Sequence, residues 1–317
     1  MSNRPLSNRA ERFVAEADED GLGAVDAVRV SERKSNLWLD AWRDLRRRWM
    51  FWIAGVFVVL LIVIALFPGL FVRVSPTACA LSDSNAPARA GHPFGFDFQG
   101  CDVYSRVIHG TSTSLSVGII VTIIIAVMGI VIGGFAGYYG GWIDSLLMRI
   151  GDMFFAIPYV LAAVVVMSMF LANRNIFVIS LAIGFFGWPA TARILRSEIL
   201  RIRSSDYVMA SEALGVSRVR TMFTHVMPNA IAPVIVVSTI GLAAAITAEA
   251  TLSFLGVGLP SDVVSWGNDI AEAQVRVRTD PMPLIDPSIA LSLTVLSFIL
   301  LGETVRDALD PKARALR

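Results

Sequence analysis

Residues 193–228 read RILRSEILRIRSSDYVMASEALGVSRVRTMFTHVMP. The stretch is rich in arginine, and it lies between two segments that are long and apolar enough to cross a membrane. A loop that merely connects two spans needs no helix-capping residues, yet this one contains several. These helix-capping and helix-ending residues therefore predict two short helices joined by a turn.

The caps define these two helices. Asp206 is positioned to cap a helix over residues 207–214, because its side chain can accept a hydrogen bond from an unpaired backbone N–H. Gly215 suits the left-handed conformation that ends helices, and Ser217 is positioned to cap a second helix over residues 218–227. A compact, capped helix is suited to docking another protein. A re-entrant connector or an interfacial helix remains the alternative from these residues alone.

The composition of the whole chain indicates a membrane protein. Only 17% of its 317 residues are charged, against roughly 25% in soluble globular proteins, and the mean hydropathy is +0.64. This excludes a soluble enzyme, a disordered protein and a disulfide scaffold. The net charge of +1 gives no indication of a nucleic-acid partner. The two cysteines and three scattered histidines do not form a metal-binding pattern.

Segments without charged residues locate the membrane spans, because an apolar helix of about 20 residues crosses the bilayer. Six such segments predict an all-α, polytopic membrane protein with six transmembrane helices. They cover residues 50–71, 110–143, 153–173, 175–192, 221–248 and 287–302.

Arginine and lysine orient these spans, since both residues concentrate on the cytoplasmic side. Most of them precede the first span, lie between the fourth and fifth spans or follow the last, so both termini are predicted to be cytoplasmic. The predicted divisions are a disordered N-terminal extension, an interfacial amphipathic helix, a first span, an extracytoplasmic loop and a permease core of five spans. They cover residues 1–35, 36–49, 50–71, 72–109 and 110–312.

The predicted interfacial helix places Trp38, Trp42, Leu45 and Trp49 on one face. Such a helix lies in the headgroup plane with its arginines toward anionic lipid. The alternative is a simple cytoplasmic extension of the first span.

The central motif resembles a known family. Residues 209–215 (MASEALG) and 225–228 (HVMP) are similar to the EAA signature of permease subunits in binding-protein-dependent ABC importers, in which a glycine and a later proline stand at the spacing of Gly215 and Pro228. The resemblance covers about residues 92–312 and is strongest to the C-type subunit of dipeptide and oligopeptide importers. Further stretches of that type are HPFG (92–95), DVYSRVIHG (102–110), SLSVG (114–118), GYYGGWID (137–144), LSFLGVGL (252–259), SWG (265–267) and RDALDP (306–311).

The sequence departs from the family pattern at three positions. Met209 stands in place of the signature glutamate, Ser211 replaces an alanine, and Cys101 replaces the usual arginine. An ionic contact made by that glutamate in relatives is therefore absent here.

The resemblance implies a type I ABC importer permease fold, in which residues of about 207–214 form a coupling helix that docks on a cytoplasmic ATPase. The contact residues carried over are Ala210, Ser211, Glu212, Ala213, Leu214, Gly215, Val216, Ser217, Arg218, Arg220 and Met222. No catalytic residue, metal ligand or cofactor is expected on this chain. ATP and Mg²⁺ are expected on partner subunits, since Lys34 and Lys312 lack the glycine-rich context of a phosphate-binding loop.

The resemblance also implies the partners and the location. They are a second, homologous permease subunit forming a heterodimer, two ATPase subunits or one fused ATPase, an extracytoplasmic substrate-binding protein and membrane lipid, with no nucleic acid. The implied location of the protein is the bacterial cytoplasmic (inner) membrane. Peptides are the expected substrates, with nickel, glutathione and haem as alternatives, and the substrate-contacting residues are unknown.

Two other classes remain as alternatives. A secondary transporter driven by an ion gradient needs ionisable groups near the bilayer midplane, whereas Glu249 is predicted near the outer interface as a structural hydrogen-bonding or gate residue. A membrane enzyme needs convergent catalytic groups, and the three histidines fall in separate segments. Outside the membrane, Cys79 and Cys101 can form a disulfide on an oxidising face, or remain two free thiols.

Overall fold

The computed structural model describes residues 37–309, and the predicted extension over residues 1–35 lies outside them. The described part of the chain is helical, and it contains no β-strand beyond two isolated bridges that join Arg89 to His92 and Phe96 to Asp102. The predicted all-α class is therefore confirmed.

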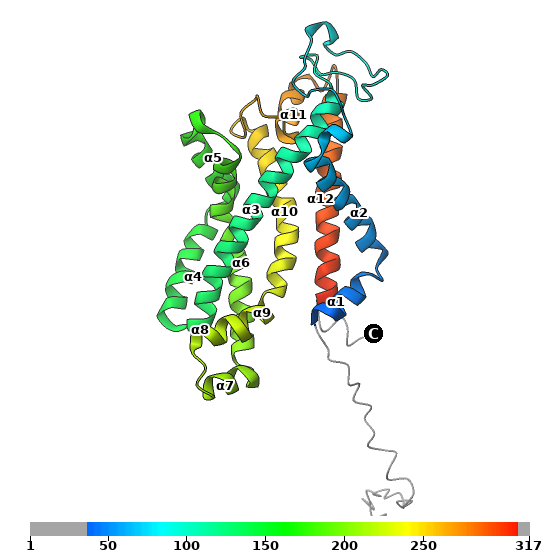
Figure 1. Ribbon diagram of the computed structural model, residues 1–317. Helices are drawn as coiled ribbons and strands as arrows, with labels where there is room; N and C mark the ends of the chain where they lie inside the picture. The colour runs from blue at the N-terminus through cyan, green and yellow to red at the C-terminus, as the bar shows by residue number, and fades with distance from the viewer. Residues whose placement is uncertain (1–36, 310–317) are drawn as a thin grey trace, which may run out of the picture. The chain divides into compact units, whose positions relative to one another are not determined.

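Five of the described helices are long and apolar enough to cross a membrane, and a bent pair of helices brings the count to six (Figure 1). The single helices are α2 (Trp49–Leu66), α3 (Val103–Tyr139), α6 (Ile176–Arg203), α10 (Ala232–Phe254) and α12 (Met282–Leu309). The bent pair is α4 (Gly141–Phe155) and α5 (Tyr159–Met169), whose axes differ by 77°.

Shorter elements precede, connect and flank the spans. They are α1 (Leu37–Leu45), α7 (Asp206–Ala213), α8 (Arg218–Thr221), a π-helical turn (Met222–Val226), α9 (Met227–Ala230), α11 (Trp266–Ala273) and 3₁₀ turns at Pro68–Leu70, Leu81–Asp83, Leu171–Asn173 and Gln274–Arg276.

Prolines explain where two spans differ from the prediction. The expected span over residues 153–173 is broken before α5, because Pro158 has no N–H with which to continue the ladder of α4. The first span ends at Leu66, five residues early, and Pro68 begins a separate turn. The second predicted helix of the central motif is likewise divided into α8, the π-helical turn and α9, which carries Pro228.

The N-terminal end of α3 extends into the segment predicted as loop. The helix begins at Val103, and Asp102 caps it by accepting a hydrogen bond from the backbone N–H of Ser105 at 3.3 Å. Arg106, four residues before the predicted start of the span at Gly110, pairs inside the fold with acidic groups from other elements.

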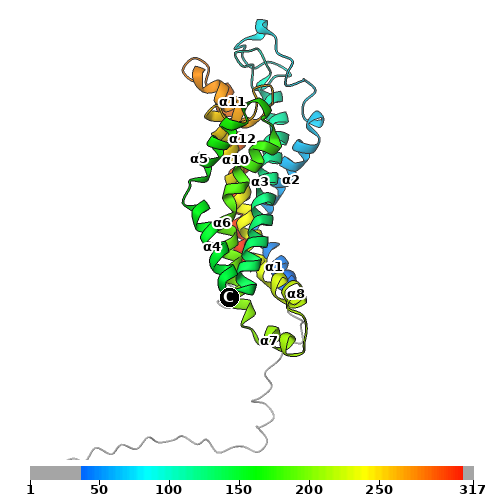
Figure 2. The same cartoon turned by 90° about the vertical axis from the view of Figure 1, so that its left-hand side faces the viewer.

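Small residues bring α3 and α6 together along the centre of the bundle, where Figures 1 and 2 show them side by side. A Cβ atom at Gly133 would collide with the carbonyl oxygen of Ala192, and one at Gly137 would lie 3.0 Å from that of Arg196. Glycine at these positions permits the close backbone approach that packs helices within a membrane.

The described part of the chain has two distinct ends. The α7 and α8 segment lies at one, here called the α7 end, and α11 lies with residues 67–102 at the other, the α11 end (Figures 1 and 2). The connection between spans four and five is thus separated by the length of the bundle from the large loop between spans one and two.

Helix α1 lies against the last span near the α7 end. Ala41 and Leu45 are buried and cluster with Ala308 of α12. The tryptophans Trp38 and Trp42 are exposed, whereas Leu45 is buried. At about 100° per residue, Leu45 projects between Trp38 and Ala41, so it lies at the edge of the tryptophan face that packs against α12.

Candidate functional site

The turn between α7 and α8 has the geometry that its glycine predicts. Gly215 has φ +80° and donates its N–H to the carbonyl of Glu212 at 3.0 Å, while Val216 donates to that of Ser211 at 3.2 Å. These paired bonds end a helix with a left-handed residue. The expected caps are not formed: Ser205 precedes the helix, Asp206 is its first residue, and neither Ser205 nor Ser217 makes a side-chain cap bond.

The turn protrudes from the bundle with an apolar tip. The side chain of Leu214 is 84% exposed, although leucine is ordinarily buried. Of the predicted contact residues, most are exposed and Val216 is half-buried. The exposed ones are Ala210, Glu212, Ala213, Leu214, Gly215, Ser217, Arg218 and Arg220.

Two of the predicted contact residues point inward. Ser211 is 7% exposed and Met222 is 2% exposed, so neither is available to a partner, and their assignment to the docking surface is corrected. The Ser211 hydroxyl lies 3.3 Å from that of Thr221 and joins α7 to α8, while Met222 packs in the cluster beneath them.

Four further exposed apolar side chains lie on α7, on α8 and on the turn after α8, outside the set of predicted contact residues. They are Tyr207, Met209, Val219 and Phe223. Tyr207 and Met209 flank buried Val208 on α7, so their exposure in the structure, and not the motif, identifies them.

A hydrogen bond ties this surface to the second span. The Tyr138 hydroxyl, at the end of α3, donates to Glu212 of α7 at 3.0 Å. The guanidinium of Arg203, at the end of α6, donates to the carbonyl of Tyr138 at 2.9 Å. The buried side chains of Val208 and Ile202 pack in the same cluster. The base of the hairpin formed by α7 and α8 is therefore held by the ends of two spans.

Ion pairs join α4 to α6 near the same end. The guanidinium of Arg196 donates to both carboxylate oxygens of Asp144, at 2.5 and 2.6 Å. Asp152 accepts from Arg193 of α6 at 2.6 Å, and not from Arg149 three residues before it. The two arginines lie on the neighbouring helix, so these pairs connect elements rather than adjacent turns.

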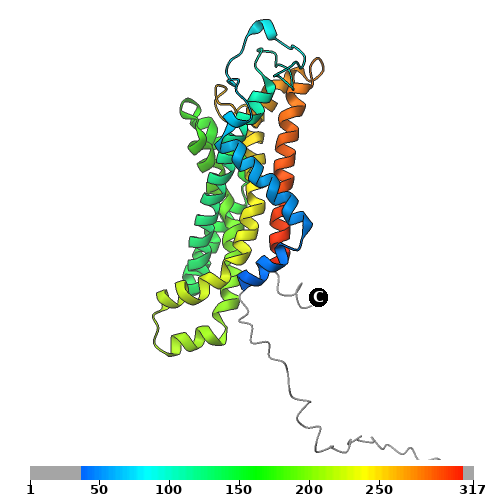
Figure 3. The same ribbon diagram turned by 45° about the vertical axis from the view of Figure 1, so that its right-hand side comes forward.

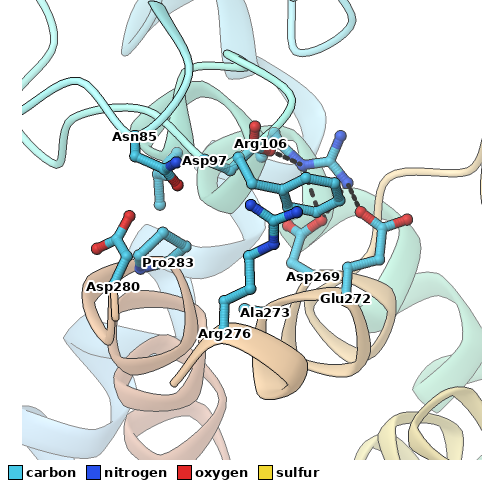
Figure 4. Close-up of a pocket in the computed structure, with 11 residues that line it drawn as sticks. Asn85, Asp97, Arg106, Asp269, Glu272, Ala273, Arg276, Asp280 and Pro283 are labelled. Atoms are coloured by element: carbon cyan, nitrogen blue, oxygen red, sulfur yellow. Dashed lines mark hydrogen bonds and ion pairs between the residues drawn. The ribbon is translucent and has the colours of Figure 1, made fainter. Parts of the chain in front are cut away.

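The α11 end contains a second cluster of charged side chains. Arg106 of α3 pairs with Asp269 of α11, and its guanidinium lies 3.8 Å from Glu272 and 3.9 Å from Asp97 (Figure 4). These groups line a cavity of about 20 Å³, and Arg276 lies over the ring of Phe98 at its edge. The cluster thereby joins α3, α11 and the loop before α3.

The environment of Asp269 disfavours its charged form. Burial raises the pKa of Asp269 to about 6, and the opposing charge of Arg106 only partly compensates. One of its oxygens, Oδ2, is buried and finds no hydrogen-bond partner among residues 37–309, so the ionised carboxylate is incompletely solvated.

Glu249 organises the contact of α11 with the spans. Its side chain is fully buried in α10 and accepts hydrogen bonds from Ser253 at 3.2 Å, Ser265 at 3.1 Å and Ser114 at 3.3 Å. The Ser265 hydroxyl also accepts the N–H of Asn268, and that of Ser114 accepts the N–H of Trp266. Both hydroxyls are therefore committed to donating to Glu249, which acts as a structural centre.

The loop before α3 is cross-linked. Cys79 and Cys101 form a disulfide, and the N–H of Cys101 donates to Asp97 at 2.9 Å. The disulfide thus anchors the start of the loop beside a carboxylate that faces Arg106.

A cavity of about 400 Å³ opens at the break between α4 and α5. Phe154, Pro158 and Tyr159 line it from the break, with Thr122 of α3 and Ser238 of α10 opposite. Its lining contains apolar and hydroxyl groups and no charged side chain. Within residues 37–309, no group of His, Cys, Asp and Glu side chains is arranged to hold a metal ion.

Two models of transport-permease families match this chain, one in its N-terminal part and one over more than half of its length. The family model described as "Binding-protein-dependent transport system inner membrane component" matches residues 129–315, and that of the "N-terminal TM domain of oligopeptide transport permease C" matches residues 36–88. The chain is 32% identical over 291 residues to the oligopeptide transport system permease protein OppC of Bacillus subtilis, covering 92% of this chain and 95% of that one.

Two other relatives are similar over comparable lengths. The dipeptide transport system permease protein DppC of Bacillus subtilis is 36% identical over 277 residues, 87% of this chain and 86% of the relative. The glutathione transport system permease protein GsiD of Escherichia coli O6:K15:H31 is 35% identical over 295 residues, 92% of this chain and 96% of the relative.

Proposed function

We propose that this chain is a permease subunit of an ATP-driven importer of peptides. The chain belongs to the family of binding-protein-dependent transport system inner membrane components. The family model covers more than half of the chain, which confirms the resemblance carried by its motifs. The chain is thus a multi-pass inner-membrane permease component. In this role it forms half of the translocation pathway, and separate ATPase subunits bind ATP and Mg²⁺.

The exposed tip of the hairpin carries this proposal. Leu214 and its exposed apolar neighbours Tyr207, Met209 and Val219 protrude where a water-facing loop ordinarily shows polar groups. Arg218 and Arg220 flank them as exposed cations. An apolar centre with a charged rim suits a groove on a soluble partner, and we assign the ATPase to it.

Cross-linking tests the assignment directly. The native cysteines are paired with each other, so Leu214→Cys introduces the accessible thiol on the hairpin. Val275 at the α11 end is also 84% exposed, and Val275→Cys is the matched control. A short bifunctional thiol–amine reagent is expected to join Leu214→Cys, and not Val275→Cys, to the copurified ATPase. Equal labelling of the two, or none at Leu214→Cys, would refute the docking role.

The translocation pathway is proposed to form with a second, homologous permease subunit. The uncharged cavity at the α4–α5 break is one side of that pathway, because a lining without fixed charge does not retain a zwitterionic peptide. The second subunit would complete the wall as a heterodimer. Purified complexes containing only one kind of permease chain would contradict this pairing.

The driving force is proposed to be ATP and not an ion gradient. Glu249 is held by three serine hydroxyls in a closed network, an arrangement that suits structure better than proton exchange. In proteoliposomes loaded with ATP, uptake is expected to continue when an ionophore collapses the proton gradient. Loss of uptake under that condition would support a secondary transporter.

The cargo is proposed to be peptides, by analogy with relatives named for oligopeptide, dipeptide and glutathione transport. A substrate-binding protein would deliver them to the α11 end, where residues 72–102 and α11 form the landing surface. In this proposed orientation, both termini and α7 would lie on the cytoplasmic side. Calorimetric titration of that binding protein with peptides, glutathione, haem and nickel chelates distinguishes the substrates.

A further inference from the structure

A sharp elbow joins α1 to α2 at the edge of the bundle, beside the C-terminal half of α12 (Figure 3). It consists of Arg46, Arg47 and Arg48. The elbow is fixed in place, because Arg48 donates to Asp44 at 3.1 Å and to Asp307 of α12 at 2.6 Å. The indole N–H of Trp52 also donates to the carbonyl of Arg46 at 3.0 Å.

Two cations at this elbow are left unpaired. The guanidinium groups of Arg46 and Arg47 are exposed and have no hydrogen-bond or ion-pair partner within residues 37–309. Their neighbours differ, since Arg43 pairs with Asp40 and Arg48 lies between two aspartates. The fixed elbow therefore presents two arginines for which the described part of the chain provides no counter-ion.

Aromatic side chains around the elbow indicate its depth in the membrane. Trp38, Trp42, Trp49 and Trp52 are between 45% and 66% exposed. Beyond Trp52, α2 exposes only apolar side chains such as Ile53 and Val56, as expected of a surface that faces lipid. Exposed tryptophans at the end of an apolar helix mark the headgroup layer. Arg46 and Arg47 consequently lie at the level of the phosphates.

We propose that the elbow is a binding site for an anionic phospholipid headgroup, held by Arg46 and Arg47 with its acyl chains along the exposed face of α2. Arginine binds phosphate oxygens bidentately, and a negative headgroup supplies the counter-charge that residues 37–309 do not. The acyl chains favour a lipid over free phosphate, since apolar surface adjoins the cations. Because Arg48 links the elbow to Asp307, the bound lipid braces the end of α12. The site requires only the membrane location and is independent of ATPase docking.

Tryptophan fluorescence provides a local readout. Of the seven tryptophans, four surround the elbow, Trp188 and Trp266 are buried, and Trp142 is the remaining exposed one. In a Trp142→Phe background, the full chain is reconstituted in phosphatidylcholine vesicles containing a small fraction of brominated phosphatidylglycerol or brominated phosphatidylcholine. Bromine quenches nearby indoles, so the ratio of quenching by the two lipids measures headgroup preference at the elbow.

Stronger quenching by phosphatidylglycerol is expected, with the preference falling roughly fivefold for each of Arg46→Gln and Arg47→Gln, the factor that corresponds to about 1 kcal/mol. The double variant Arg46→Lys/Arg47→Lys should keep most of the preference for phosphatidylglycerol. Arg149→Gln removes one exposed arginine from α4 and is the charge-matched control, expected to have no effect. Equal quenching by both lipids, or an unchanged preference when Arg46→Gln and Arg47→Gln are combined in one chain, would overturn the proposal. An equal loss in Arg149→Gln would assign the preference to net charge and overturn it too.

Discussion

The hydroxyl of Tyr138, the penultimate residue of α3, donates a 3.0 Å hydrogen bond to Glu212 on the helix that protrudes from the bundle. The two residues are 74 positions apart in the chain. Met209, at the glutamate position of the EAA-like motif, is exposed. Glu212 supplies a carboxylate one turn further along α7, and this carboxylate is hydrogen-bonded to the end of a span.

Removing this hydrogen bond should weaken the transmission of motion from α7 to the second span. Tyr138→Phe is expected to lower ATP-driven uptake about fivefold, the effect of losing a bond that contributes about 1 kcal/mol. ATPase binding should remain. Tyr139→Phe, at the neighbouring position, is the control, since the Tyr139 contacts in the structure are ring contacts. Uptake in proteoliposomes, together with copurification of the ATPase, measures both effects.

Enlarging the tip of the hairpin should separate the permease from its ATPase. Ala213 is exposed, so Ala213→Trp leaves the fold intact while blocking close approach of another surface. Gly215→Pro forces φ from +80° toward about −65° and reorients the turn. Both variants are expected to lose at least about tenfold in uptake at normal membrane levels, whereas Ala213→Ser retains it. Normal uptake by well-expressed Ala213→Trp would remove the coupling role.

The network around Glu249 should be stabilising. Glu249→Leu leaves three buried serine hydroxyls without their acceptor and is expected to reduce the free energy of unfolding by about 2–3 kcal/mol. Glu249→Gln keeps one oxygen that can accept from Ser253 and Ser265, so the free energy of unfolding should fall by less than in Glu249→Leu. Thermal denaturation in detergent compares the two variants. If both were as stable as the parent chain, Glu249 would have no structural part.

Asp269 should make stability depend on pH. Its pKa is raised to about 6 in the folded chain from an ordinary 3.8, so between these values the folded chain holds a proton that the unfolded chain has released. This contribution to the free energy of unfolding is present below pH 4 and is lost as the pH rises through 6. Denaturation midpoints measured from pH 4 to 7 should show that loss, and Asp269→Asn should show less of it. Identical pH profiles would exclude the effect.

The parts of the fold that were predictable depend on local chemistry. The uncharged segments located the spans, and Gly215 located the turn because few other residues adopt its backbone conformation. The EAA-like motif indicated the family, which the comparisons confirm. The cap of α7 was misplaced by one residue, since Ser205 and Asp206 both suit that position and only the register of the helix chooses between them.

Contacts between distant segments could not be predicted. The start of α3 was missed because the predicted span began at Gly110, after both His109 and the charged Arg106. The partner of Arg106, Asp269, lies 163 residues away in the sequence. The inward orientation of Ser211 and Met222 depends on packing beneath the hairpin, which the motif does not encode. The break at Pro158 was foreseeable from the proline itself, but a charge criterion alone does not register it.

The disulfide between Cys79 and Cys101 has a practical consequence for topology mapping. Cys101 is fully enclosed, and bonds of this kind persist only on the oxidising side of a membrane. The oxidation state of these two sulfurs in intact cells is therefore a built-in reporter of which compartment the loop reached during biogenesis. It can be read by trapping free thiols at lysis, with no tag or fusion added to the chain.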